Sequence, residues 1–500
     1  MIDIASRREC FFDDFLIDTE NTTAEKRLHK PVRQGTLLEM NKEWEGKYTT
    51  MYSVIKAEGK YKMYYTTTLD TQNKFICYAE SENGEDWVRP NLGIVEFRGS
   101  KENNILMDIP MLVKDFDFTN FDNLSVFYDE NPKCPADEKY KLTALWIGHR
   151  ALIALFSADG IHFTKSRVLT DDGAFDSQNR AFWSEAHNKY FAYYRGEHDP
   201  AENIEICDKS YTDRVANELY DPLKFLLREP GKGTHTFMRD IRMIESEDFV
   251  NWSKQRLINT SGNDYQLYFN TIFPYPRAPH ILLGFPMRYV ERKAWTKCYD
   301  ELCGREKRLE RMQTMARWGL AISDGLFMSS RDGYNFDKFD EAFLPPPAES
   351  PEAFVYGDGT AAPALIEVPS NLEGAENEYM LILREAFRAA EGPNKLAKYT
   401  IRLDGFVSRH AGGEEATLKT KEFTYSGEDL FVNLATSARG YAYFTLKCGD
   451  EEVTSLEMFG NSTNKRIRFD DDETVKRFSG KPVTLEIKMF DCDIYSLKFE

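Results

Sequence analysis

Short runs of alternating apolar and polar residues fill the first four hundred positions of the chain. In the first group, residues 48–55, 61–66 and 75–79 are separated by turn-forming and charged residues. Successive side chains of a strand point to opposite faces, so period-two alternation rich in Tyr, Thr, Val and Ile predicts β-strands. Similar groups follow at 124–156, 181–246, 266–328 and 351–403. The pattern therefore predicts five sheets in succession.

One short turn recurs four times at the ends of these runs. It reads Ser-x-Asp or Ser-x-Asn, then a fourth residue that is usually Gly, and an aromatic residue six positions after the Ser. Asp, Asn and Ser side chains bond the backbone of such turns, and Gly supplies a positive φ without steric cost. The third copy has Phe249 in place of Gly, so we expect it to close differently or Asp248 to adopt the left-handed conformation. The copies are Ser81–Trp87, Ser157–Phe163, Ser246–Trp252 and Ser330–Phe336.

The repeat and the strand pattern together predict an all-β protein with two domains. Radial repetition of a four-stranded unit is typical of a β-propeller, and residues 1–403 have room for five blades. Four unrelated surface hairpins are the alternative, which the regular spacing disfavours. From about residue 404 the motif stops but short strands continue, so residues 404–500 predict a C-terminal β-sandwich.

Two polar stretches interrupt the predicted blades. Residues 197–235 are expected to form a loop with a short helix near 214–219, and loops of that length are usually functional or disordered. Residues 291–316 are highly charged and are expected to be helical, either as a lid or as a surface helix.

Composition and charge exclude several classes of function. Hydrophobic residues make up 42% of the 500 residues and aromatic residues 14%, which suits large cores and sugar-stacking surfaces. The net charge of −18 argues against nucleic acid and anionic membranes as partners. The first residues lack the apolar core of a signal peptide, and no apolar run is long enough to span a bilayer. We therefore expect a cytoplasmic protein whose eight cysteines are reduced.

Polar residues cluster where the innermost strand of each predicted blade begins. A propeller brings these positions together around one axial pocket, where mixed donors and acceptors suit a hydroxyl-rich carbohydrate. The strongest candidate is the segment 175–180, although an Asx-turn that closes a loop is the alternative. The residues predicted to bind substrate are Asp122, Gln178, Asn179, Arg195, Tyr268, Asn270, Arg277, His280 and Asp358.

Six short segments carry a resemblance to a known group of proteins. They are Phe12–Ile17, Cys77–Ser81, Phe175–Asn179, Arg277–His280, Ser330–Gly333 and Ile494–Phe499. These segments resemble bacterial proteins related to glycoside hydrolase families 32 and 43, and the resemblance covers nearly the whole chain. It implies a five-bladed propeller, a terminal sandwich and three catalytic acids: a base or nucleophile, a transition-state stabiliser and a general acid. That mechanism requires no metal or other cofactor, although some propeller glycosidases hold a structural ion.

The chain departs from the signatures of those families. Trp-Met-Asn-Asp-Pro, Arg-Asp-Pro and Glu-Cys-Pro are all missing. By resemblance, Asp176 falls where the stabilising Asp of the family lies, and Glu45 or Asp14 takes the role of the acid in the first blade. Asp358 and Glu378 remain as alternatives for the general acid.

The sequence therefore predicts a glycoside hydrolase that cleaves a small oligosaccharide or glycoside, with Asp176, Glu45 and Asp14 as catalytic residues. The missing signature acids favour a non-catalytic carbohydrate-binding propeller as the alternative. A glycoside phosphorylase would need a basic phosphate pocket, for which Arg277 and Arg288 are available. A protein-binding scaffold would instead expose a large apolar patch.

Overall fold

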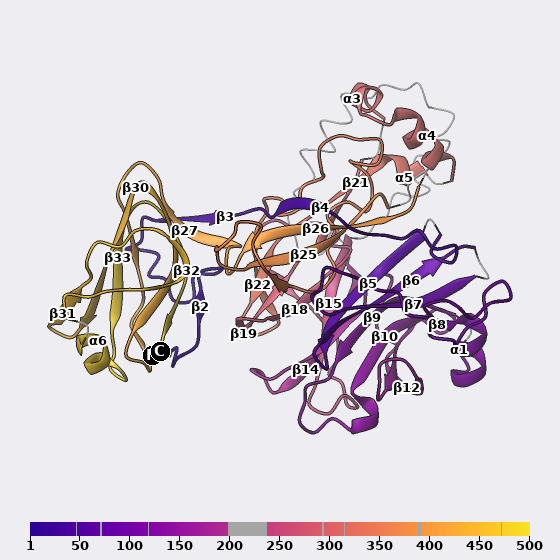
Figure 1. The fold of residues 1–500 in the computed structure, drawn as a ribbon, viewed down its shortest axis with the longest axis horizontal. Helices are drawn as coiled ribbons and strands as arrows, with labels where there is room; N and C mark the ends of the chain where they lie inside the picture. The colour runs from indigo at the N-terminus through magenta and orange to yellow at the C-terminus, as the bar shows by residue number, and fades with distance from the viewer. Residues whose placement is uncertain are drawn as a thin grey trace.

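Five β-sheets radiate around a common axis, and a further body of strands lies to one side of them (Figure 1). The computed structural model describes the chain except residues 47, 71–72, 119, 199–237, 293–294, 315, 388–391 and 472. The predicted five-bladed propeller is confirmed. The helix expected near 214–219 and nearly all of the polar stretch 197–235 lie outside the described residues.

The first three blades are four-stranded antiparallel sheets whose strands follow one another in chain order from the axis outward. Alternating apolar residues of each inner strand face the neighbouring blades, so the inner strands are largely buried. Blade one holds β5 (Tyr48–Ala57), β6 (Lys60–Thr68), β7 (Lys74–Ser81) and β8 (Ile105–Asp108), followed by α1 (Ile109–Phe116). Blade two holds β9 (Phe121–Tyr128), β10 (Tyr140–Trp146), β11 (Ala151–Ser157) and β12 (Phe163–Thr170). The short helix η1 (Ala136–Glu138) lies between β9 and β10 in the chain. Blade three holds β13 (Arg180–Ser184), β14 (Lys189–His198), β15 (Met238–Ser246) and β16 (Arg256–Leu257).

Blade four has an insertion between its second and third strands. Its sheet runs outward as β18 (Ile272–Tyr275), β19 (Ala278–Gly284), β22 (Met328–Ser330), β23 (Asn335–Lys338) and β17 (Asn259–Thr260). The insertion is a hairpin of β20 (Met287–Glu291) and β21 (Ala321–Gly325) that carries α3 (Lys297–Glu301), α4 (Arg305–Thr314) and α5 (Ala316–Leu320). The helical character expected for 291–316 is thus confirmed, and its role as a lid stays a prediction. None of the helices in the described ranges is both long and apolar enough for a membrane span.

Blade five is completed by a strand from the beginning of the chain. It runs from the axis as β24 (Ile366–Val368), β25 (Glu378–Glu385), β26 (Lys395–Arg402) and β4 (Val32–Glu39). This closure explains why five blades contain only four copies of the repeated turn. The turn leads from the third strand towards the fourth in blades one to four, whereas the fourth strand of blade five comes from the N-terminal part of the chain.

The four turns share one hydrogen-bonding scheme, and the expectation for the third copy was wrong. Phe249 itself adopts the left-handed conformation, with φ 60°, and donates its backbone N–H to Ser246 Oγ as the glycines of the other copies do. Its ring packs in the core that blades two and three share, and this burial offsets the backbone strain. The turns also join blades, because Tyr64 of blade one donates its hydroxyl to Gly160 O of blade two at 3.0 Å.

The body beside the propeller is built from both ends of the chain. Two long strands, β30 (Leu430–Cys448) and β33 (Thr484–Phe499), form the centre of an eight-stranded sheet around an apolar core (Figure 1). The remaining strands of that sheet are β2 (Glu9–Cys10), β3 (Glu25–Leu28), β27 (Val407–Ala411), β28 (Ala416–Lys419), β31 (Glu451–Thr454) and β32 (Asn461–Arg466). A small sheet of β1 (Ile2–Asp3) and β29 (Phe423–Thr424) and the helix α6 (Glu473–Phe478) belong to the same body.

The division of the chain at residue 403 stays a prediction, as does the sandwich arrangement of the C-terminal strands. The strand pairing nevertheless assigns the first 28 residues to the C-terminal sheet rather than to the propeller. Ile4, Phe11 and Ile17 are buried in the same core as the C-terminal strands. The seven cysteines among the described residues are free thiols.

Candidate active site at the mouth of the propeller axis

The inner strands begin with strained backbone at one end of the axis. Met51, Asn123 and Thr271 adopt positive φ of 54°, 57° and 46°, just before or within the first residues of three inner strands. In blades one and two these residues lie at β-bulges, where the strand pairing shifts register. Left-handed conformation is unfavourable for non-glycine residues, and most of all for a β-branched Thr. Bulges and strain of this kind concentrate next to active sites, which marks this end of the axis as the candidate site.

A small cavity of about 10 Å³ lies at this mouth, and we call it the axial pocket. Four of the five blades contribute to its lining, which consists of Met51, Tyr52, Gln178, Phe269, Thr360, Ala361, Ala362 and Arg384. The side-chain amide of Gln178 donates to Tyr52 O of blade one at 2.8 Å, and the backbone carbonyl of Gln178 accepts from Asn270 Nδ2 at 3.1 Å. The structure thus brings Gln178 and Asn270 together at the axis.

Asn179 and Arg180 lie deeper and join the blades to one another. Asn179 donates its amide to the carbonyls of Asn123 and Phe175, both at 3.1 Å, and is fully buried. Arg180 donates to Ser125 Oγ of blade two at 2.7 Å, and burial lowers the pKa of its guanidinium to about 9. These contacts are structural, so Asn179 supports the mouth from below.

Asp176 and Arg195 form an ion pair at the mouth. The guanidinium of Arg195 donates to Asp176 Oδ2 at 2.6 Å and also pairs with Glu197. Arg195 is buried, whereas the Asp176 side chain is 62% exposed. The Arg195 guanidinium also lies 5.5 Å from the ring centroid of Tyr268, which is the residue before Phe269 of the axial pocket. Three of the predicted residues, Asp176, Arg195 and Tyr268, are therefore in one contact chain.

Three further residues pack around Tyr268, and the sequence analysis did not identify them: Arg239, Tyr289 and Tyr356. Arg239 lies 5.6 Å from the ring of Tyr268 and 4.6 Å from that of Tyr289, and Tyr356 packs edge-on against both rings. Burial raises the pKa of Tyr268 well above its usual value. Arg239 is the second residue of β15, directly after a long polar stretch, and only the strand ladder places it opposite Glu197. No local motif marks such a residue.

Asp358 is a second carboxyl group close to the axial pocket. It precedes Thr360 of the pocket lining by two residues, and its Oδ2 accepts the backbone N–H of Val355 at 3.0 Å. Burial raises its pKa to about 7, while the backbone hydrogen bonds and the nearby arginines Arg384 and Arg308 oppose that shift. Asp358 is thus an acid whose proton is exchangeable near neutral pH.

The two other predicted catalytic acids lie elsewhere. Glu45 is completely buried in blade one, where Arg89 and the hydroxyl of Tyr65 each donate to its Oε1 at 2.7 Å. Asp14 pairs with Arg409 of the C-terminal sheet, because the segment around it belongs to that body. Neither of these carboxylates has a hydrogen bond or ion pair with any described lining residue of the axial pocket. Asp122 lies near the start of β9 and pairs with Lys74 at 2.9 Å.

Arg277 and His280 do not lie at the mouth. They belong to the turn and the second strand of the inner hairpin of blade four, and β18 runs away from the mouth before it reaches that turn. Arg277 lies 3.3 Å from Asp404, and His280 lies 3.2 Å from Glu9, so both contact residues of the N- and C-terminal segments. Arg288, the other arginine considered for phosphate, donates Nε to Asp324 at 2.9 Å.

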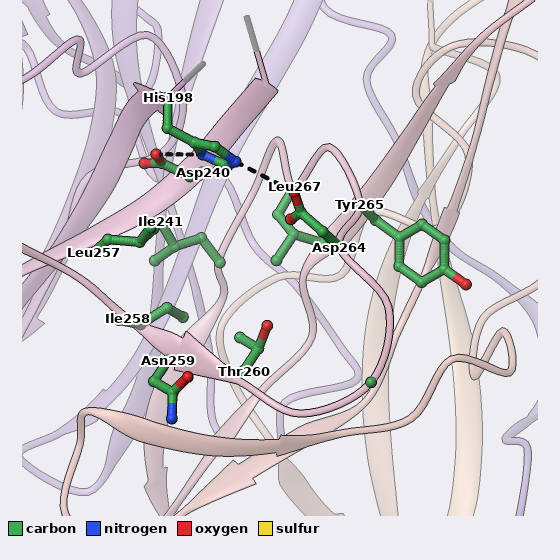
Figure 2. A pocket seen from close by; sticks show the side chains of 11 residues that line it. His198, Asp240, Ile241, Leu257, Ile258, Asn259, Thr260, Asp264, Tyr265 and Leu267 are labelled. Carbon is green, nitrogen blue, oxygen red and sulfur yellow. Dashed lines mark hydrogen bonds and ion pairs between the residues drawn. The ribbon is translucent and has the colours of Figure 1, made fainter. Parts of the chain in front are cut away.

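A larger cavity of about 250 Å³ lies between blades three and four and shares no lining residue with the axial pocket. Figure 2 shows His198 between two carboxylates, Asp240 at 2.9 Å and Asp264 at 3.2 Å. Hydrogen bonds to these carboxylates raise the pKa of His198 to about 9. Both ring nitrogens of His198 contact a carboxylate, Asp240 on blade three and Asp264 in loop 261–267. His198 therefore links that loop to blade three.

Comparison with known proteins gave matches among solved structures alone. No family model and no curated protein matches the chain. A thermostable family-43 glycoside hydrolase matches 74% of this chain and 95% of its own, with 12% identity and a TM-score of 0.41. An N-acetylgalactosamine deacetylase from F. plautii, solved with blood group B trisaccharide, matches 75% of this chain and 96% of its own, with 9% identity and a TM-score of 0.44. A protein of unknown function from Dyadobacter fermentans matches 95% of this chain and 99% of its own, with 9% identity and a TM-score of 0.36.

Proposed function

We propose that this protein is a glycoside hydrolase whose active site is the mouth of the propeller axis. The proposal rests on the different environments of two carboxyl groups that lie near the axial pocket. Asp176 is exposed and ion-paired with Arg195, whereas Asp358 is buried and has a pKa raised to about 7. Glycosidic bond cleavage needs one carboxyl group that gives a proton and one carboxylate that acts as base or nucleophile.

Asp358 is assigned the role of general acid. Its raised pKa keeps a large fraction of the group protonated at neutral pH, so that it can protonate the departing glycosidic oxygen. Asp176 is assigned the role of base or nucleophile, since its carboxylate reaches solvent and Arg195 fixes its position. Gln178 at the pocket and the ring of Tyr268 would bind the sugar hydroxyls and the sugar face.

The assignment leaves out two acids that the sequence favoured. Glu45 is bound by Arg89 and Tyr65 in the interior of blade one, and Asp14 by Arg409. Both carboxylates serve ion pairs outside the axial pocket. Each is therefore proposed to stabilise the fold rather than to act on substrate.

A non-catalytic sugar-binding propeller is the second candidate. A general acid must reach the glycosidic oxygen, but only 6% of Asp358 is exposed. This burial favours a propeller that binds sugar without cleaving it. A phosphorylase that uses Arg277 and Arg288 has less support, since both arginines already contact carboxylates.

A substrate screen separates these functions. Purified protein is incubated with p-nitrophenyl glycosides and with fructan, arabinan and mannan oligomers, with and without inorganic phosphate, and the double variant Asp176→Asn/Asp358→Asn serves as the blank. Release of sugar by the wild type and not by the blank supports the hydrolase. Release that depends on phosphate supports a phosphorylase, and binding of sugars without release supports the sugar-binding propeller.

A further inference from the structure

The axial pocket is lined by a single charged residue, and that residue is a cation. Among the described residues that line it, Arg384 is the one with a formal charge, and no carboxylate belongs to the lining. Its guanidinium is held by hydroxyl groups, with Thr50 Oγ1 at 2.6 Å and Thr360 Oγ1 at 3.2 Å, and it stacks on Phe387 at 3.7 Å. The lining therefore presents positive charge to a bound molecule.

Two further guanidinium groups lie beside the same mouth. Arg195 and Arg239 both lie over the ring of Tyr268, at 5.5 Å and 5.6 Å from its centroid. Tyr268 is adjacent in the chain to Phe269, which lines the pocket. The rings of Tyr268 and Phe269 are 5.5 Å apart, and Arg384 lies 5.9 Å from the Phe269 ring, so three arginines from two blades lie over two neighbouring rings in a protein whose net charge is −18.

The carboxylates nearby do not balance the charge of Arg239. Asp176 and Glu197 both pair with Arg195. Glu197 lies opposite Arg239 in the strand ladder, yet within the described part of the chain no carboxylate comes within ion-pair distance of Arg239. Arg239 is 1% exposed, donates to the neutral amide of Gln266, and has its pKa lowered by burial. A buried cation without an anion is costly, and a bound anion would offset that cost.

We propose that the ligand bound at the mouth of the propeller axis carries an oxyanion group, such as the carboxylate of a uronic acid, a sulfate or a phosphate, which Arg384 and Arg239 recognise. Guanidinium groups match the planar and tetrahedral oxyanions by paired N–H donors, and they stay charged when desolvated. Elsewhere the acidic surface repels anions, so a local cluster of arginines is needed to bind one. This inference rests on the proposed function, since it names the substrate class of that same site.

Isothermal titration calorimetry of the intact protein tests the proposal. The titrants are D-glucuronate against D-glucose, D-galacturonate against D-galactose, and sodium sulfate and inorganic phosphate against sodium chloride. We expect at least one oxyanion to bind about tenfold or more tightly than its neutral or halide counterpart, because hydrogen bonds to charged groups contribute more than neutral ones. Equal affinity within every pair, or no binding by any oxyanion, overturns the proposal.

Variants locate the binding to the named arginines. Arg384→Gln and Arg239→Gln are each expected to weaken binding of the favoured oxyanion about tenfold more than binding of its neutral counterpart. Arg98→Gln is the matched control, because Arg98 is an exposed arginine paired with Glu43 in the outer part of blade one. If a buried variant does not fold, the wild-type comparison decides alone. Oxyanion binding without cleavage of any glycoside contradicts only the hydrolase, whereas cleavage of neutral glycosides without oxyanion binding contradicts only this inference.

Discussion

The carboxylate of Asp176 lies 2.6 Å from the guanidinium of Arg195, and the two groups differ strongly in their exposure. Arg195 is 5% exposed and is held by strand β14, whereas Asp176 belongs to the loop before β13 and is 62% exposed. The buried arginine therefore fixes a carboxylate that solvent and a ligand can reach. Such an arrangement suits a reacting group better than a stabilising ion pair, because exposed pairs contribute little to stability.

Asp176→Asn is expected to lower kcat/KM for a hydrolysed glycoside by about 10² to 10⁴-fold, since an amide cannot act as base or nucleophile. The Tm should change little, because an ion pair with an exposed partner contributes about 0 to 1 kcal/mol. Steady-state kinetics and thermal unfolding measure the two effects. Asp122→Asn is the control, as Asp122 is also an exposed carboxylate paired with a cation of the same propeller. Equal losses in both variants would remove Asp176 from the mechanism.

Because of the raised pKa of Asp358, we expect the free energy of unfolding to fall as pH rises. Its folded pKa of about 7 lies above the usual 3.8, so the folded protein retains a proton that the unfolded chain releases between those values. Across that window unfolding free energy decreases, by at most about 1.4 kcal/mol per pH unit for one proton. Asp358→Asn should remove this slope and be more stable than the wild type at pH 8. Urea unfolding at pH 4 to 8 measures it, and identical slopes in the two proteins contradict the expectation.

Glu45→Gln tests whether this predicted catalytic residue is structural. The change removes the charge that faces the side chain of Arg89, which is itself only 12% exposed. We expect a loss of about 3 to 5 kcal/mol of unfolding free energy, the cost of leaving one partner of a buried pair without the other. Glu43→Gln, in an exposed pair with Arg98, is the control and should cost far less. Hydrolysis by the folded fraction of Glu45→Gln should remain at the wild-type rate; a large fall in kcat at full folding would restore Glu45 to the mechanism.

We expect His198, which lies between blades three and four, to make a second pH-dependent contribution to the free energy of unfolding (Figure 2). Its pKa is raised to about 9 by Asp240 and Asp264, and Arg242 also contacts Asp240. Because the folded pKa lies above the usual 6.5, the stabilisation is complete below about pH 6.5 and is lost as pH rises through 9. His198→Gln should therefore flatten the stability curve between pH 6.5 and 9. His162→Gln, which alters an exposed His–Asp pair, should leave the slope intact.

Local sequence patterns were sufficient to predict the strands and the propeller. Period-two alternation depends on neighbouring residues only, and so does the Ser-x-Asp turn, whose side chains bond their own backbone. The turn at Phe249 shows the limit of that reasoning. Its glycine-like conformation is accompanied by burial among aromatic rings of blades two and three, which no local motif contains.

Which polar residues meet at the axis was decided by the tertiary structure. The sequence predicted that Glu45 lies at the propeller axis. In the structure Arg89, 44 positions later in the chain, binds Glu45 inside blade one. Asp14 looked like part of the first blade, but its segment pairs with the C-terminal sheet. Arg239 and Arg384 carry no motif and yet lie beside the axial pocket. The physical reason is that alternation specifies which face of a strand is buried, whereas the partner of each buried charge is chosen by contacts between segments far apart in the chain.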